Sequence, residues 1–211
     1  MVHNSDCLPA LREMKDNQFD LAIVDPPYGI KRDDWDSNIP TDEYFSELQR
    51  VSKNQIIWGG NYYNLPHTQG WICWDKTFSD DIRNKKLTQG GVPRENMSDF
   101  ELMWTSFLTK SKFIRYTYIG NLCGFNDNLN VDYKQGKKIH ITQKPIELYK
   151  YLLKNYAKPN NTILDTHVGS GSSRIACWEM GFDFTGYEID KDYWDAQEKR
   201  FNIVKAQLNI F

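Results

Sequence analysis

The chain has 211 residues, of which 40% are apolar and 26% are charged, and its formal net charge is −2. This length allows one sizeable hydrophobic core and leaves little room for a second full domain. No apolar run reaches the roughly 18 residues of a membrane-spanning helix, and the N-terminus lacks the pattern of an export signal, so we expect a cytoplasmic protein with no membrane partner.

The cysteines and histidines give no sign of a disulfide framework or a metal centre. The four cysteines are scattered without a C-x-x-C pair, which predicts reduced structural thiols. His140 and His167 lack a second ligand at metal-binding spacing, so we expect no metal.

The N-terminal part of the chain predicts alternating helices and strands. Asp6 is a candidate N-cap for a helix that runs to Lys15, and the apolar residues 21–24 predict a short buried strand. Thr41 is a second candidate N-cap, followed by a helix to residue 51 and a strand over 55–58. A strand, a helix and a second strand in this order predict a βαβ unit with parallel strands. Residues 71–74 predict a further strand.

An unusual segment, Asp25-Pro26-Pro27-Tyr28, directly follows the first of these strands. Proline fixes φ and has no N–H, so the two proline carbonyls point in set directions without a local donor. Asp25 adds a side-chain acceptor, and Tyr28 adds a flat apolar face. Such a corner suits an amino group on a planar ring, although a proline-stiffened loop explains four residues equally well.

The middle of the chain is locally basic. Residues 76–138 hold eleven Lys and Arg against seven Asp and Glu, so this stretch is the one candidate for a phosphate-facing surface, with an ordinary solvated face as the alternative. Residues 77–95 and 121–138 predict loops. Residues 100–107 and 113–119 predict two strands that pair with one another in antiparallel fashion.

A second motif lies near the C-terminus, after a predicted helix over 146–157. A strand over 162–165 leads into the turn Gly169-Ser170-Gly171, a helix over 173–180 and a strand ending at Glu188. Glu188 lies 19 positions after Gly169, where an acid can accept hydrogen bonds from ribose hydroxyls. The turn has neither a dinucleotide fingerprint nor a phosphate-gripping lysine. It therefore suits a nucleoside without a pyrophosphate, such as S-adenosylmethionine.

Together, the two motifs resemble the β class of DNA amino-methyltransferases, in which the D-P-P-Y segment precedes the cofactor turn. Residues 165–171 match the D-x-x-x-G-S-G pattern of that family, and residues 142–145 match its T-Q-K-P. Three positions depart from the family pattern: His167 replaces a phenylalanine, Ile141 replaces a proline, and Ser5 replaces the glycine before Asp6.

The resemblance covers nearly the whole chain and implies the fold. We expect an α/β fold, a single Rossmann-like methyltransferase domain over residues 1–211. Its mostly parallel sheet is expected to have seven strands with helices on both faces, in the permuted order that places the catalytic segment before the cofactor turn. Residues 77–138 are expected to form a target-recognition insert.

The resemblance also implies roles for individual residues. The Asp25 carboxylate and the Pro26 carbonyl would accept the two N–H bonds of the target amine, while Tyr28 would stack on a base rotated out of the duplex. The implied catalytic residues are Asp25, Pro26, Pro27 and Tyr28. The implied cofactor, S-adenosylmethionine, would contact Asp6, Asp25, Lys144, Asp165, Gly169, Ser170, Gly171 and Glu188, with Lys144 at the methionine carboxylate. The implied DNA-binding residues are Tyr28, Lys85, Lys86, Lys137 and Lys138.

Several functional alternatives stay open at this point. Within the family D-P-P-Y accompanies transfer to adenine N6 more often than to cytosine N4, so adenine is favoured. Methylation of RNA or of a small molecule, and a non-catalytic nucleic-acid-binding role, are further alternatives. The intact catalytic segment argues against the last, and the basic insert argues against a small-molecule substrate. A homodimer is possible, and the sequence leaves the biological role open between restriction–modification, phage and regulatory systems.

Overall fold

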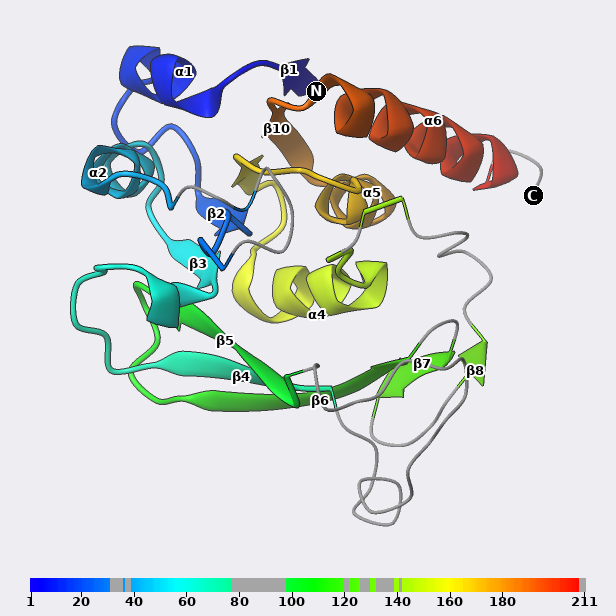
Figure 1. Ribbon diagram of the computed structural model, residues 1–211, viewed down its shortest axis with the longest axis horizontal. Helices are drawn as coiled ribbons and strands as arrows, with labels where there is room; N and C mark the ends of the chain where they lie inside the picture. The colour runs from blue at the N-terminus through cyan, green and yellow to red at the C-terminus, as the bar shows by residue number, and fades with distance from the viewer. Residues whose placement is uncertain are drawn as a thin grey trace.

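A computed structural model describes residues 1–30, 36, 39–76, 98–119, 122–125, 130–131, 139–140 and 142–208. These residues form one sheet of ten strands in the order β1-β10-β9-β2-β3-β5-β4-β6-β7-β8, with helices packed against it (Figure 1). The strands are β1 (Val2–Asn4), β2 (Leu21–Val24), β3 (Gln55–Trp58), β4 (Trp71–Asp75), β5 (Phe100–Thr105), β6 (Lys112–Ile119), β7 (Leu122–Phe125), β8 (Asn130–Val131), β9 (Thr162–Asp165) and β10 (Asp183–Glu188). The helices are α1 (Cys7–Glu13), α2 (Asp42–Val51), the short 3-10 turn η2 (Gly60–Tyr62), α4 (Ile146–Tyr156), α5 (Ser172–Glu179) and α6 (Lys191–Leu208).

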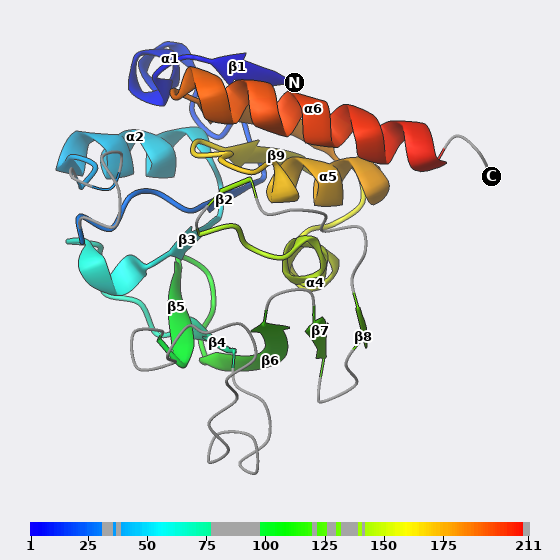
Figure 2. The ribbon, with the colours of Figure 1, turned by 45° about the vertical axis from the view of Figure 1, so that its right-hand side comes forward.

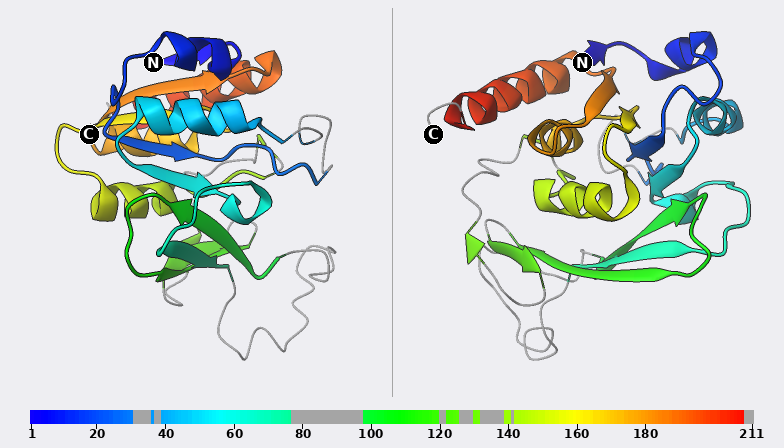
Figure 3. Two further views of the ribbon diagram at one scale, coloured as in Figure 1. Left: turned by 90° about the vertical axis from the view of Figure 1, so that its left-hand side faces the viewer. Right: turned by 180° about the vertical axis from the view of Figure 1, so that it is seen from behind.

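The centre of the sheet is buried on both faces. Along β2, Leu21 and Ile23 belong to the core that includes α4 and α5, whereas Ala22 and Val24 belong to the core that includes α1 and α2. Successive side chains of a strand point to opposite faces, so one apolar run serves two cores. The result is a three-layer arrangement with helices on both sides of the sheet (Figures 2 and 3).

The predicted helix starts are confirmed. The Asp6 side chain accepts a hydrogen bond from the Leu8 amide at 3.0 Å and caps α1. The Thr41 hydroxyl accepts from the Tyr44 amide at 3.3 Å and caps α2. An N-cap acceptor satisfies one of the amide groups that have no partner inside the helix.

The first half of the sheet is parallel and places the two sequence motifs side by side. β2 pairs in parallel with β3, as the βαβ prediction requires, and its other neighbour is β9. Since β1, β10, β9, β2 and β3 all run in one direction, their carboxyl ends meet at one edge. The helix after β2 covers one face and the helix after β9 covers the other, so this edge is a topological switch point, where α/β proteins bind ligands.

The second half of the sheet differs from the sequence-based expectations. The strands predicted over 100–107 and 113–119 exist as β5 and β6, but β4 lies between them, antiparallel to β5 and parallel to β6. The sheet has ten strands instead of seven, in part because β1 and β8 are too short for a sequence pattern to reveal. β5, β6, β7 and β8 all lie within residues 77–138, and β7 and β8 fall in the stretch 121–138 that was expected to be a loop.

The C-terminal helix α6 was not predicted from the sequence. It packs beside β1 and α5, and its start is fixed by the Asp190 carboxylate, which accepts from the amides of Asp192 and Tyr193 at 2.8 and 3.0 Å. Among the helices in the described ranges, α6 included, none is both long and apolar enough to cross a membrane.

Candidate active site

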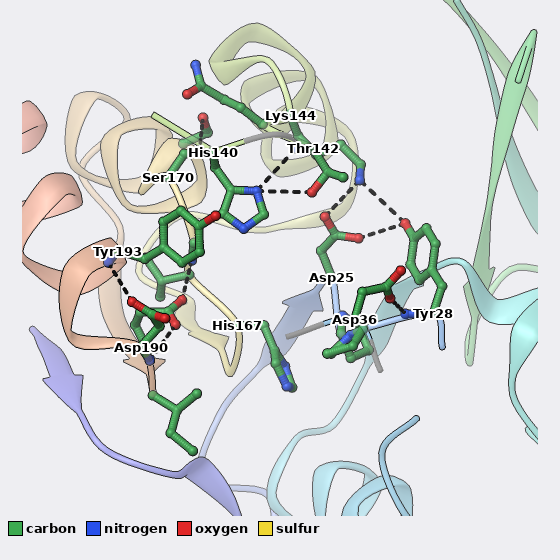
Figure 4. A pocket seen from close by; sticks show the side chains of 18 of the residues that line it. Asp25, Tyr28, Asp36, His140, Thr142, Lys144, His167, Ser170, Asp190 and Tyr193 are labelled. Carbon is green, nitrogen blue, oxygen red and sulfur yellow. Dashed lines mark hydrogen bonds and ion pairs between the residues drawn. The ribbon is translucent and has the colours of Figure 1, made fainter. Parts of the chain in front are cut away.

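The two motifs line one cavity of about 170 Å³ at the switch point (Figure 4). The D-P-P-Y segment forms one side of the cavity, and the glycine turn with the end of β10 forms another. Of the residues predicted to act in the site, the cavity is lined by Asp25, Pro26, Pro27, Tyr28, Lys144, Gly169, Ser170 and Glu188.

The carboxylate of Asp25 has a partner on each oxygen. Oδ1 accepts a hydrogen bond from the Tyr28 hydroxyl at 2.7 Å, and Oδ2 accepts from the Lys144 ammonium at 2.7 Å. Burial raises the pKa of Tyr28, and the charges of Asp25 and Glu101 raise it further, so the hydroxyl remains a donor. A carboxylate has about four lone-pair positions, so Asp25 keeps acceptor capacity for an incoming N–H group.

Lys144, expected at the methionine carboxylate of the cofactor, lines the cavity and pairs with two acids. The Lys144 side chain is 6% exposed, and its ammonium lies 2.7 Å from Asp25 Oδ2 and 3.2 Å from Glu101 Oε2. Burial lowers the pKa of Lys144, but the two carboxylates more than offset this effect, so its pKa is raised and the group stays charged. Lys144 is therefore a buried counterion of Asp25.

The proline carbonyls, which lack a local donor, receive one from a distant part of the chain. The Tyr63 hydroxyl donates to the Pro26 carbonyl at 2.7 Å and lies 3.1 Å from the Pro27 carbonyl. Tyr63 follows η2, far along the chain, so no local pattern reveals this contact. A carbonyl has two lone pairs, which leaves the Pro26 oxygen able to accept a second hydrogen bond.

The Tyr28 ring is held between neighbouring residues. Tyr62 stacks on it with ring centroids 4.9 Å apart and planes 12° apart. Gly59 has a φ of +62°, which side-chain-bearing residues rarely adopt, and a Cβ atom there would lie 2.4 Å from the Tyr28 ring. Both the backbone conformation and the lack of space therefore require glycine at this position. The amides of Tyr28 and Gly29 both donate to Asp36 Oδ1, at 2.7 and 3.0 Å, which fixes the turn.

The glycine turn is closed onto β10 by Glu188. Its Oε2 accepts from the Gly169 amide at 2.7 Å, and its Oε1 accepts from the Asp190 amide at 2.9 Å. Burial raises the pKa of Glu188, while these backbone donors lower it. The carboxylate is thus a fixed acceptor at the rim of the cavity, with lone pairs left over for ligand hydroxyls.

Three residues expected to contact the cofactor do not line the cavity: Asp6, Asp165 and Gly171. Asp6 caps α1. Asp165 is 1% exposed and accepts hydrogen bonds from the Ser173 hydroxyl at 2.5 Å and the His167 amide at 3.0 Å. These bonds hold the residues on either side of the glycine turn in place. The expected DNA-binding residues Lys85, Lys86, Lys137 and Lys138 lie outside the described residues.

Sequence reasoning gave His140 and Tyr193 no role in the wall of the cavity, where they lie beside Thr142 of the T-Q-K-P match. The Thr142 amide donates to His140 Nδ1 at 3.2 Å, and the His140 ring lies against Tyr193 with centroids 4.3 Å apart. Because a backbone amide only donates, Nδ1 is the acceptor, and the neutral ring carries its proton on Nε2. His140 lies just before the T-Q-K-P motif, but Tyr193 is on α6, whose weak pattern gave no signal.

No cluster of three or more His, Cys, Asp or Glu side chains with metal-binding geometry occurs among the residues that the structure describes. The wall of the cavity offers a strand-end carboxylate, backbone amides and aromatic rings. This set fits a nucleoside.

Comparison with known proteins identifies the family of this chain. The profile of the family N6_N4_Mtase, described as DNA methylase, matches residues 60–199, more than half of the chain. The type II methyltransferase M.HinfI of Haemophilus influenzae is 26% identical over 253 residues, covering 99% of this chain and 70% of that protein. M1.MboII of Moraxella bovis is 23% identical over 260 residues, covering 99% and 97%.

Solved structures share the fold at low sequence identity. The M1.HpyAVI–SAM complex has a TM-score of 0.62 at 20% identity and covers 95% of this chain and 98% of that chain. The cytosine-N4-specific PvuII DNA methyltransferase has a TM-score of 0.58 at 13% identity and covers 95% and 85%. These likenesses establish a Rossmann-like methyltransferase fold, and the extent of the profile match establishes the family: the chain belongs to the DNA methylases of the N6_N4_Mtase family.

Proposed function

We propose that this protein transfers a methyl group from S-adenosylmethionine to the exocyclic amine of a base in DNA, and that the product is N6-methyladenine. The observation that carries the proposal is the shared cavity, which the D-P-P-Y segment and the glycine turn line from two sides. The D-P-P-Y form of the motif favours adenine over cytosine.

The cavity residues suit the proposed cofactor. Glu188 would accept hydrogen bonds from ribose hydroxyls, and the amides and carbonyls near Gly169 and Ser170 would face the rest of the nucleoside. Ile189 is 68% exposed at the cavity rim and offers an apolar face for a purine ring. Two structures with the same fold are described as complexes with this compound, those of M1.HpyAVI and of TTHA0409 from Thermus thermophilus.

The chemistry asked of the protein is alignment and charge stabilisation. The lone pair of an exocyclic amine is delocalised into the base, which makes the nitrogen a weak nucleophile. Acceptors on its two N–H bonds, Asp25 and the second lone pair of Pro26, favour a pyramidal nitrogen whose lone pair points into the cavity. When bound, S-adenosylmethionine supplies a methyl group already activated by its sulfonium sulfur, which leaves as a neutral thioether.

Asp25 also stabilises the positive charge that develops on the nitrogen, and the nitrogen afterwards loses a proton to solvent. The target atom is out of reach inside a duplex, so the base is expected to rotate out and to stack on Tyr28. Tyr62 covers one face of that ring, so the base takes the other face or displaces Tyr62. Lys85, Lys86, Lys137 and Lys138 are proposed to contact the DNA backbone.

The identity of the methylated nucleoside tests this proposal. The protein would be incubated with S-adenosylmethionine and unmethylated duplex DNA, and the digested DNA would be examined by mass spectrometry, with single-stranded DNA and RNA as competitors. We expect N6-methyladenine and a preference for DNA.

Each other outcome of this experiment corrects a different part of the proposal. N4-methylcytosine would reassign the base, as in the PvuII enzyme with the same fold. Preferential methylation of RNA would reassign the substrate, and no methylated nucleoside under any condition would overturn the enzymatic assignment.

A further inference from the structure

Glu101 lies beside the candidate active site without lining its cavity. It is on β5, and its Oε2 atom is 3.2 Å from the ammonium of Lys144. Its other oxygen, Oε1, is 2.9 Å from the ammonium of Lys76, which directly follows β4. Neither Glu101 nor Lys76 belongs to the D-P-P-Y segment or to the glycine turn.

These contacts form a row of alternating charges that ends at the catalytic segment. The order is Lys76, Glu101, Lys144, Asp25, and the Asp25 carboxylate then accepts from the Tyr28 hydroxyl. The side chains of Lys144, Asp25 and Glu101 are 6%, 17% and 21% exposed. Water screens such a row weakly, so a change at one member alters the field at the next.

The row contains two positive and two negative groups, and the charge of Lys144 matters for the proposed reaction. A nitrogen that becomes positive next to Asp25 is stabilised by the carboxylate and destabilised by a nearby ammonium. Glu101 offsets that ammonium from the side away from the cavity.

We infer that Glu101 is a positioning residue for the proposed methyl transfer: it balances the charge of Lys144, so that Asp25 keeps its negative field for the target amine. The inference rests on the proposed function. It assigns Glu101 no contact with cofactor or DNA.

The ionisable groups around Lys144 set the sign of the expected pH effect. They are Asp25 and Tyr28 from the catalytic segment and Glu101 from β5, with Lys76 behind it. Tyr149 on α4 is a further ionisable group on which the charges of Asp25 and Glu101 act. Burial lowers the pKa of Lys144 and the two carboxylates raise it. Removing the charge of Glu101 therefore lowers the pKa of Lys144, and raising the pH then removes the unbalanced ammonium.

The test is the variant Glu101→Gln, assayed for methyl transfer to DNA between pH 7 and 9. At pH 7 we expect kcat to fall about tenfold, with the Kd for S-adenosylmethionine, measured by calorimetry, within about twofold of wild type. As the pH rises, kcat of the variant should recover relative to wild type. In protein labelled with [13C]lysine, NMR should report a lower pKa for Lys144.

Controls separate charge balance from a structural role. Glu101→Asp keeps the charge and should recover most of the activity, and Glu101→Gln/Lys144→Met should be more active at pH 7 than Glu101→Gln alone. Glu179→Gln is the matched control, since it removes a partly buried glutamate that pairs with Lys150, away from the cavity. It should leave the pH profile unchanged.

The results distinguish this inference from the proposed function. Wild-type protein without methyl transfer would overturn the proposed function. Active wild type, together with a Glu101→Gln variant that has wild-type kcat or an unchanged pH profile, would overturn the role of Glu101 alone.

Discussion

At the scale of single residues, two carboxylates at the carboxyl edge of the sheet differ in the groups that bond to them. Asp25 is held by a lysine and a tyrosine hydroxyl, whereas Glu188 is held by two backbone amides. Side-chain partners can be altered by substitution without moving the backbone. The Glu188 carboxylate, by contrast, is bonded to two backbone amides, so its position is fixed by the fold of the turn. A fixed acceptor suits a residue that holds a ligand in place.

The substitution Glu188→Gln tests that role. The amide oxygen of glutamine accepts one backbone N–H, but its NH₂ group faces the other, and the charge is lost. Hydrogen bonds to charged groups contribute about 1.5–3 kcal/mol, so the Kd for S-adenosylmethionine should rise about tenfold or more. Calorimetric titration measures this, with Glu147→Gln on α4 as a surface control. An unchanged Kd would exclude Glu188 from the cofactor site.

At the scale of elements, the glycine turn between β9 and α5 is fixed from several directions. Gly171 has a φ of +78°, and a side chain there would meet Gln197 Cβ at 3.1 Å. Arg200 donates to the Ser170 carbonyl at 2.8 Å. These contacts come from α6, so the C-terminal helix supports the turn that the sequence motif defines.

The buried acid below this turn should leave a signature in stability. Burial raises the pKa of Asp165 to about 7, against the lowering effect of hydrogen bonds from Ser173 and His167. Between pH 4 and 7 the folded protein holds a proton that the unfolded chain has lost, so this group's contribution to stability falls as the pH rises. Burial lowers the pKa of His167 to about 4, which gives the opposite slope between pH 4 and about 6.5.

The variant Asp165→Asn lacks the titrating carboxyl, so the fall in stability with rising pH that Asp165 causes is absent. The free energy of unfolding of the variant relative to wild type should therefore increase steadily from pH 4.5 to pH 7, measured by urea denaturation. His167→Phe, compared in the same way, should show the reverse trend. A difference between Asp165→Asn and wild type that does not vary with pH would contradict a raised pKa at Asp165.

At the scale of the whole molecule, local signals in the sequence predicted the parallel half of the sheet. N-caps at Asp6 and Thr41, apolar runs at β2 and β3, and the glycine turn all depend on neighbours within a few residues. The family resemblance then placed Asp25 and Glu188 at one edge, and the structure places both on the same cavity.

The rest depends on contacts between distant parts of the chain. The order β5-β4-β6 could not be predicted, because strand propensity does not specify the pairing partner. Lys144 and Asp25 are 119 positions apart, and Tyr63 and Pro26 are 37 positions apart. A motif search finds Lys144 but cannot reveal that its ammonium forms an ion pair with the Asp25 carboxylate.

The central claim is that two distant segments meet in one cavity to carry out methyl transfer. Transfer of a tritiated methyl group from S-adenosylmethionine to unmethylated duplex DNA, by wild type and by Asp25→Ala, tests it most directly. We predict labelled DNA with wild type and at least a roughly hundredfold slower labelling with the variant. Equal labelling by both proteins, or none by wild type, would contradict the claim.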